Sequence, residues 1–296
     1  MDDSRETNGA FDKKVVGIRR LKEPMPTPIK TRIFTVANQK GGVGKTTTAV
    51  NVAAALAMGG LRVLVIDLDP QGNACTALGI DRNNLAGMFE VLVNDRPISD
   101  VVQKAVGFPH LECAPADLAL SGAEVNMVSF VSRESRLKFA IEKFLTEREA
   151  AGQRIDYVII DCPPSLGLLT VNALTAAEEV LVPIQCEYYS LEGLTLLLQT
   201  LQQVQQLLNK RVHISTIVLT MYDSRTRLAN DVANSVRQHF PKELIDIPIP
   251  RAVRISEAPS FNQTVMTYDA SSPGAVAYMQ IAREIAQRGV ASIEVA

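Results

Sequence analysis

A short apolar run, a glycine-rich loop and an apolar helix follow one another near the amino terminus, and this succession constrains the fold most. Residues 33–37 read Ile-Phe-Thr-Val-Ala, the loop contains Gly41, Gly42 and Gly44, and residues 46–58 are rich in Ala and Val. Glycines let backbone N–H groups wrap an anionic phosphate that a Cβ would obstruct. The positive end of the following helix adds to the attraction. The stretch therefore predicts a strand, a phosphate-binding loop and a helix.

The loop departs from the ordinary P-loop pattern, G-x-x-x-x-G-K-[ST], in two ways. Gly44-Lys45-Thr46 matches the end of the pattern, but Gln39 replaces its opening glycine, and a second lysine, Lys40, stands inside the loop. One lysine can serve the β- and γ-phosphates of the nucleotide in its own loop, so Lys40 is surplus charge. Lysine and glycine also combine in ordinary surface turns, but the flanking strand and helix favour a nucleotide site.

Size and composition indicate a globular α/β protein. The 296 residues are enough to bury a large core, and 47% of them are hydrophobic, which suits helices covering a buried parallel sheet. No apolar run approaches the roughly 20 residues of a membrane span, and the polar amino terminus is unlike a signal peptide. The cysteines form no C-x-x-C pair and predict buried, reduced thiols in a cytoplasmic protein; they are Cys75, Cys113, Cys162 and Cys186.

Apolar runs alternate with amphipathic stretches along most of the chain. Strands are expected at 33–37, 61–67, 111–113, 157–160, 180–184, 214–219 and 244–247, and helices at 46–58, 132–150, 168–177, 190–208, 227–239 and 273–288. This alternation implies right-handed crossovers and a doubly wound, mainly parallel sheet flanked by helices, the α/β class of P-loop NTPases. Residues 1–30 mix charges with prolines and predict a mobile arm. Residues 31–290 are expected to form a single domain, and 291–296 a C-terminal tail.

Three aspartates lie at or just beyond the carboxyl ends of predicted strands, the edge where open α/β sheets bind ligands. Asp161 follows four apolar residues and fits the acid that orients water on a Mg²⁺ ion held by Thr46. Asp67 is expected close to that metal, behind its direct ligands, and Asp69 is placed to orient an attacking water. A helix cap would also explain Asp161. An Asp-Pro turn would explain Asp69 but not Asp67.

The net charge of −2 conceals a basic segment in the last third of the chain. Residues 210–254 contain eight Lys and Arg against four Asp and Glu, which gives +4 and leaves −6 for the rest. A local basic excess of this kind fits a surface that binds a polyanion.

Four motifs together resemble the ParA/Soj chromosome-partitioning ATPases, which carry a deviant Walker A loop. The motifs are NQKGGVGKTT at 38–47, DLDPQGN at 67–73, DCPPS at 161–165 and EYY at 187–189. They occur in the family's order, and the resemblance spans about residues 31–290. It implies a Mg²⁺-dependent ATPase that hydrolyses ATP slowly until a partner protein stimulates it.

The resemblance assigns roles around the ATP. Lys40 would be the signature lysine that reaches the nucleotide of a partner chain, so that two ATP molecules lock a homodimer. Asp69 would position the hydrolytic water, and Asp161 would be the Walker B acid. The residues implied to hold the nucleotide are Gln39, Lys40, Gly41, Gly42, Val43, Gly44, Lys45, Thr46, Thr47, Met221 and Pro250, with Thr46 on Mg²⁺ and Thr47 on the α-phosphate.

The resemblance also implies binding to double-stranded DNA without sequence preference. The matching arginines are Arg225 and Arg254, both in the basic segment found by counting charges. Such binding is mostly phosphate neutralisation and should depend steeply on salt. A ParB-type centromere-binding protein would stimulate hydrolysis, and the protein would associate with the nucleoid. The family usually has Asn where this chain has Ala252.

Three alternatives compete with this interpretation. A MinD-like cell-division ATPase shares the lysine and the sandwich dimer but acts at membranes through a basic amphipathic C-terminal helix. Residues 289–296, GVASIEVA, do not predict such a helix, so no membrane partner is expected. An iron–sulfur reductase would need cysteines bridging a dimer axis, a setting that Cys113 and Cys162 lack. A nucleotide-gated adaptor with little turnover of its own remains open.

Overall fold

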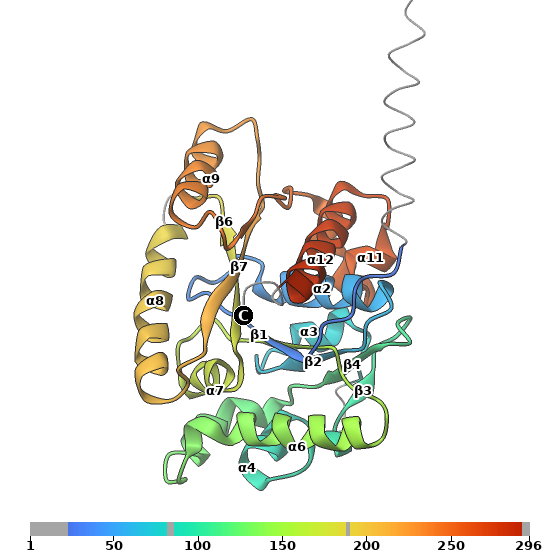
Figure 1. Cartoon of the computed structure of the whole chain (residues 1–296), viewed down its shortest axis with the longest axis vertical. Helices are drawn as coiled ribbons and strands as arrows, with labels where there is room; N and C mark the ends of the chain where they lie inside the picture. Colours follow the sequence, from blue (N-terminus) through green and yellow to red (C-terminus); the bar gives the residue numbers. More distant parts are fainter. Residues whose placement is uncertain (1–22, 82–85, 188–189, 292–296) are drawn as a thin grey trace, which may run out of the picture.

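The computed structural model describes residues 23–81, 86–187 and 190–291, which form one eight-stranded sheet between two layers of helices (Figure 1). The strands are β1 (Arg32–Val36), β2 (Val63–Asp67), β3 (Gln103–Lys104), β4 (Leu111–Ala114), β5 (Tyr157–Asp161), β6 (Glu179–Gln185), β7 (His213–Thr220) and β8 (Leu244–Ile245). Their order is β3-β4-β2-β5-β1-β6-β7-β8. All pairs except β3–β4 are parallel, which confirms the doubly wound, mainly parallel sheet.

Helices connect successive strands and cover both faces of the sheet. The α-helices are α2 (Lys45–Met58), α3 (Asn73–Ala77), α4 (Met88–Asn94), α5 (Ala123–Asn126), α6 (Arg136–Ala150), α7 (Leu168–Ala176), α8 (Ser190–Leu207), α9 (Arg227–His239), α10 (Val253–Glu257), α11 (Val265–Tyr268) and α12 (Pro273–Ala291). Short 3₁₀ turns lie at Ile98–Asp100, Leu118–Gly122, Arg133–Ser135 and Ala258–Phe261. All strands and helices expected from the sequence are present, with ends shifted by a few residues.

Alternating side chains of the central strands pack against opposite helical layers. Val63 and Val65 of β2 belong to the core that contains α2 and α12, whereas Leu64 and Ile66 pack with α4 and α6. Every residue of β2 and β5 is buried, which explains why these strands are continuous apolar runs in the sequence.

The strand order reverses at β1, which lies between β5 and β6 and is the topological switch point of the sheet. The chain builds β2, β4 and β5 on one side of β1 and then crosses to add β6, β7 and β8 on the other. A crevice at the carboxyl ends of the strands is expected at such a reversal, and ligands of doubly wound sheets bind there. The loop that follows β1 opens at this crevice.

An ion pair whose side chains are only 10% and 13% exposed fixes the amino end of β1. Arg32 donates from Nε and Nη2 to the two carboxylate oxygens of Glu179 on β6, at 2.7 and 2.6 Å, and from Nη1 to the carbonyl of Ile285 on α12. Its guanidinium also lies 4.8 Å from the ring centroid of Phe34. The pair therefore joins β1, β6 and α12 at the end of the sheet opposite the crevice.

Residues 23–30, the last eight of the predicted arm, contact the domain. Residues 1–22 lie outside the described residues, as do 292–296 of the predicted tail. Met25 is buried, and its N–H donates to the carbonyl of Gly59 at 2.9 Å. Arg154 donates to the carbonyls of Pro28 and Ile29 at 2.6 and 2.7 Å. Within the described part of the chain, no helix is both long and apolar enough to cross a membrane.

Candidate nucleotide-binding site

The glycine-rich loop adopts the conformation that its sequence predicts. Gly42 and Gly44 have φ of +72° and +84°, in the left-handed region that favours glycine. A Cβ on Gly41 or Gly42 would meet no protein atom within 4 Å, so both face open space. Conformation explains Gly42, whereas for Gly41 the reason is the close approach of a ligand. The loop leads into α2, whose first residue is Lys45.

Neighbouring strands hold the loop in place. Asn38, which is buried, donates from Nδ2 to the carbonyl of Pro183 on β6 at 2.8 Å. Thr220, at the end of β7, donates from Oγ1 to the carbonyl of Val43 at 2.9 Å. The sequence analysis did not identify Thr220, because a threonine ending a strand has no distinctive pattern. These two bonds fix the loop at the crevice between β1 and β6.

The two loop lysines are in different environments. Lys45 is buried, and its Nζ donates to the carbonyl of Lys40 at 3.1 Å. Burial lowers the pKa of Lys45, while the nearby carboxylates of Asp161 and Asp69 oppose that shift. Lys40 instead directs its Nζ to the carboxylate of Glu187, 3.2 Å away, and its side chain is 27% exposed. The surplus lysine thus lies at the mouth of the site rather than inside it.

Asp161 is a fully buried carboxylate at the end of β5. Among the described residues, neither of its oxygens has a hydrogen-bond partner. Burial raises the pKa of Asp161 well above its usual range, the neighbouring Asp67 raises it further, and the Thr46 hydroxyl and Lys45 oppose the shift. A cation and its water would satisfy these oxygens, so the site fits Mg²⁺.

The donor set also favours Mg²⁺ that arrives with a nucleotide. Mg²⁺ usually keeps several waters and takes one or two protein ligands together with substrate phosphates. The described part of the chain has no group of three or more His, Cys, Asp or Glu side chains arranged to hold a metal. Thr46 and Asp161 beside an open phosphate loop meet the smaller requirement.

Asp67 has a different set of contacts from Asp161, its register partner on β5. One carboxylate oxygen accepts from the N–H of Asp69, and the other accepts from the N–H and the thiol of Cys75, all at 3.1 Å. Burial raises the pKa of Asp67 to about 6. These bonds anchor the loop that carries Asp69. The position of Asp67 beside Asp161 leaves its expected place near the metal a prediction.

Two residues expected to hold the nucleotide, Met221 and Pro250, are brought together by the backbone. Tyr222 pairs with Pro250, and the N–H of Arg251 donates to the carbonyl of Tyr222 at 3.1 Å. This places Met221 beside Pro250. Met221 has φ of +50°, which is uncommon for a residue with a long side chain and typical of functional sites.

Ala252 occupies the N-cap position of α10 and cannot cap it with its side chain. Asparagine is a preferred N-cap because its side-chain oxygen accepts a backbone N–H of the first turn. An Asn at this position, which the resemblance led us to expect, could cap α10, whereas Ala252 cannot.

A cavity of about 210 Å³ adjoins the start of α2. Its polar lining includes Thr46, Thr47 and Asn73, and its apolar wall includes Ile255 and Pro259. The segment from residue 255 to 265 was not identified as part of the site from sequence, because only its packing against α2 and α3 brings it there.

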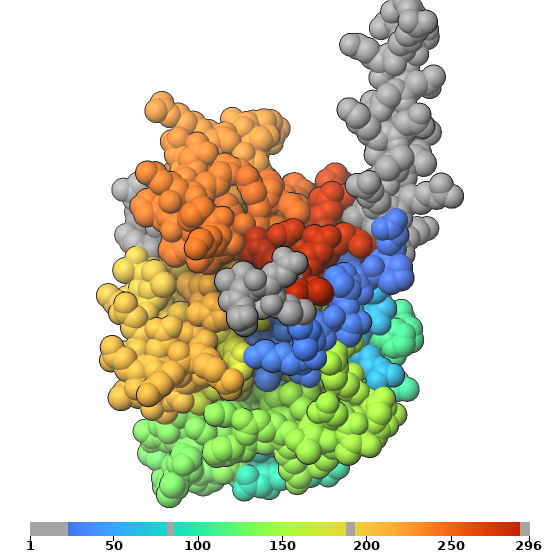
Figure 2. Space-filling view, viewed as in Figure 1, coloured from blue at the N-terminus to red at the C-terminus, as the bar shows by residue number. Residues whose placement is uncertain are grey.

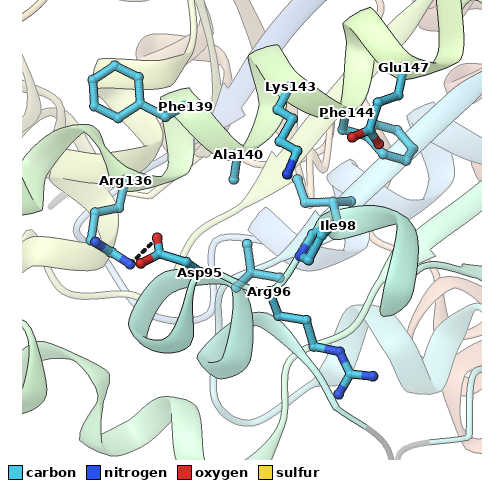
Figure 3. A pocket seen from close by; sticks show the side chains of 11 residues that line it. Asp95, Arg96, Ile98, Arg136, Phe139, Ala140, Lys143, Phe144 and Glu147 are labelled. Carbon is cyan, nitrogen blue, oxygen red and sulfur yellow. Dashed lines mark hydrogen bonds and ion pairs between the residues drawn. The ribbon is translucent and has the colours of Figure 1, made fainter.

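A second cavity, of about 220 Å³, lies between α4 and α6 (Figure 3). Phe144 and Ile98 line it, together with Arg136, whose guanidinium is paired with Asp95, and with Lys143. None of the predicted nucleotide residues lines this cavity, and it plays no part in the site described above.

The two arginines expected to contact DNA lie on the surface near α9 and α10. Arg225 is 87% exposed, and Arg254 is 58% exposed. The Arg225 guanidinium binds both carboxylate oxygens of Asp223, at 2.9 and 2.7 Å, and holds the pKa of that carboxyl down to about 2. Arg254 lies 3.5 Å from Glu257. Figure 2 shows the orange surface, to which α9 belongs, at the end of the molecule opposite the green surface of α6.

Replacing Asp161 tests whether its carboxylate is buried without a partner. Its folded pKa is raised, so the wild type loses stability as pH rises above the unfolded value of about 3.9. Asp161→Asn should therefore raise the free energy of unfolding at pH 8, where the wild-type carboxylate would have to be charged in a buried site. The gain should shrink toward pH 4, as measured by urea unfolding without nucleotide or metal.

Asp156, just before β5, provides the matched control. It is also buried, but it accepts from the N–H of Arg62 at 2.8 Å and from Arg154 at 3.0 Å. Asp156→Asn should therefore lower stability at pH 8. A loss of stability in Asp161→Asn, or a gain that does not change with pH, would contradict the assignment.

Comparison with known proteins identifies the family of this chain. A family model described as an AAA domain matches residues 31–214. The chain is 48% identical over 259 residues to the sporulation initiation inhibitor protein Soj of Bacillus subtilis, covering 87% of this chain and 99% of that protein. It is 47% identical over 258 residues to the chromosome partitioning protein ParA of Myxococcus xanthus, covering 87% and 88%.

A solved structure gives the same result for the fold. Cobyrinic acid a,c-diamide synthase from Mycobacterium smegmatis, with bound ADP and magnesium, superposes with a TM-score of 0.74 at 38% identity. The match covers 87% of this chain and 95% of that one. With the deviant phosphate loop, the buried aspartate and nearly full-length relatives in agreement, this chain belongs to the ParA/Soj family of partitioning ATPases.

Proposed function

We propose that this protein is an ATP-dependent DNA-segregation ATPase. Its ATP-bound homodimer binds double-stranded DNA non-specifically and leaves it when hydrolysis is stimulated by a ParB-type, centromere-binding partner. The observation that carries the proposal is the combination of a phosphate loop with a second lysine at its mouth and a buried aspartate that has no hydrogen-bond partner in the described part of the chain. The names of relatives that share 47–48% of its residues support the partitioning role.

The phosphate loop and its two aspartates would bind and hydrolyse the nucleotide. Lys45 and the amides of residues 39–47 would hold the phosphates, as the open space beside Gly41 and Gly42 allows. Thr46 and Asp161 would hold Mg²⁺, which supplies charge neutralisation of the phosphates. The presence of ADP and magnesium in the structure of the synthase supports both ligands.

Asp69 would orient the attacking water. Its backbone N–H donates to the carboxylate of Asp67 at 3.1 Å, and it accepts from the N–H of Gln71 at 3.0 Å. The acid is thereby held on a loop that is itself anchored to the buried end of β2. Such positioning is how P-loop enzymes contribute to hydrolysis beyond charge stabilisation.

Lys40 would contact the nucleotide bound to a second chain. Its ammonium lies at the mouth of the site, where only the carboxylate of Glu187 is within salt-bridge distance among the described residues. A lysine there can reach a phosphate presented from outside the chain. Dimerisation would then require nucleotide in both chains.

Arg225 and Arg254 would contact DNA phosphates. Both are exposed and lie in the basic segment, and both are paired with acids that phosphate would displace. A dimer doubles the number of such contacts, so affinity for DNA rises when ATP brings two chains together. This links DNA binding to the nucleotide state. We propose a nucleoid-associated, cytoplasmic protein on that basis.

Co-sedimentation with double-stranded DNA tests the function. The protein should bind with ATP and Mg²⁺, but not with ADP or without nucleotide. Binding should fall by about 10³-fold or more between 50 and 200 mM salt if six or more phosphates are contacted. Binding that ignores nucleotide or salt would contradict the proposal.

Substitution of the two arginines locates the DNA-binding surface. A variant with Arg225→Ala and Arg254→Ala should lose binding and still dimerise with ATP. Arg96→Ala should bind as the wild type, because Arg96 is a 45%-exposed, ion-paired arginine that follows α4, and α4 lies at the opposite end of the molecule from α9 (Figure 1).

Asp69→Ala tests the catalytic assignment. Loss of water positioning should reduce hydrolysis stimulated by DNA and the partner by about 10²-fold or more, while ATP binding is retained. Release of phosphate and binding of a fluorescent ATP analogue measure the two effects. Asp100→Ala, which removes an exposed aspartate of the Ile98–Asp100 turn, should hydrolyse at the wild-type rate. Wild-type turnover by Asp69→Ala would overturn the role.

A further inference from the structure

Glu187 lies just beyond β6, across the crevice from the phosphate loop that follows β1. One of its carboxylate oxygens is 3.2 Å from Lys40 Nζ, and the other accepts a hydrogen bond from Gln185 Nε2 at 2.6 Å. Gln185 is buried, so its side chain has little freedom to move and holds the Glu187 carboxylate in place. The Lys40–Glu187 pair is partly shielded from solvent, at 27% and 45% exposure.

The same carboxylate reaches the basic segment. Arg251 Nη2 lies 3.6 Å from the oxygen that Gln185 also binds. Arg251 stands between Pro250 and the start of α10, which carries Arg254. Glu187 therefore joins the phosphate loop to the loop that would face the base and DNA.

The backbone of Lys40 is fixed independently of its side chain. Its N–H donates to Asn38 Oδ1 at 3.1 Å, and its carbonyl accepts from Lys45 Nζ at the same distance. Helix α8 packs so closely on this turn that a Cβ on Gly193 would lie 2.9 Å from Asn38 Oδ1. The Lys40 ammonium can thus change partner without any rearrangement of the loop.

We propose that Glu187 is a positioning residue that holds the Lys40 ammonium in its own subunit until a second, ATP-loaded copy competes for it. This inference rests on the proposed function, in which Lys40 binds the partner's nucleotide. A triphosphate carries more negative charge than one carboxylate, so it binds the Lys40 ammonium in place of Glu187. ADP carries less negative charge than ATP and competes less well. Gln185 and Arg251 stay bonded to Glu187, so the released carboxylate is not left unpaired. The pair raises the protein concentration at which the ATP dimer forms.

Glu187→Gln tests the pair by removing its charge at nearly constant shape. Sedimentation velocity with Mg²⁺ and a non-hydrolysable ATP analogue gives the concentration at which half of the chains dimerise. Each chain gives up one partly exposed pair, so this concentration should fall by about two- to twentyfold relative to the wild type.

Glu178→Gln is the matched control. Glu178 stands just before the other end of β6 and also pairs with two cations, Lys30 at 2.7 Å and Arg211 at 3.0 Å. Its replacement should leave the dimerisation midpoint unchanged.

Salt separates an electrostatic role from a structural one. The advantage of Glu187→Gln should disappear near 1 M salt, where the screening length falls to about 3 Å. Equal or weaker dimerisation of Glu187→Gln at low salt, or an advantage that salt does not reduce, would overturn the inference while the proposed function stands. A wild type that stays monomeric with the analogue would overturn both.

Discussion

The junction of β1 with β6 is the constraint on which the rest of the site depends. At one end it is closed by the bidentate Arg32–Glu179 pair, which is largely shielded from solvent and is bonded to α12 as well. At the other end Asn38 crosses from the phosphate loop to the Pro183 carbonyl. Breaking a buried pair by removing one partner typically costs about 3–5 kcal/mol. The loop therefore begins from a strand that cannot slide relative to its neighbour.

The site concentrates negative charge where a cation is expected. Asp161 has no hydrogen-bond partner among the described residues, and its neighbour Asp67 is a second buried carboxyl. Desolvation raises the pKa of both. Buried charged groups that lower the stability of the protein are common at functional sites, where a ligand supplies the missing partner. Binding of nucleotide with Mg²⁺ would be favoured because it relieves the repulsion.

Much of the fold follows from apolar runs that the sequence displays openly. Strands β2 and β5 are buried on both faces, and their residues are apolar up to the final aspartate. Strand β3 was not expected, because two polar residues, Gln103 and Lys104, carry no period and pair only through the backbone at the sheet edge. The short turns between residues 80 and 130 also lack a hydrophobic period in the sequence. Their positions depend on tertiary packing, including contacts with α6.

The parts of the candidate site that belong to a motif with fixed residue spacing could be predicted from the sequence. The parts that depend on contacts between distant residues could not. Lys40 and Lys45 stand out from sequence, but the partner of Lys40, Glu187, lies 147 positions away and is reached only through the β1–β6 junction. The motif at 187–189 drew attention to Glu187, although residues 188 and 189 lie outside the described part of the chain. The three hydrogen bonds of Asp67 were not predicted either, because they depend on the conformation of the loop that follows β2.

The central claim is that Lys40 converts nucleotide state into oligomeric state. Sedimentation velocity of the wild type and of Lys40→Ala, each with Mg²⁺ and either a non-hydrolysable ATP analogue or ADP, tests it directly. The wild type should dimerise only with the ATP analogue. Lys40→Ala should bind the analogue and remain monomeric, while Lys143→Ala, at an exposed position of α6 beside the cavity between α4 and α6, should dimerise normally. A Lys40→Ala dimer at wild-type concentrations, or a wild-type dimer with ADP, would contradict the account.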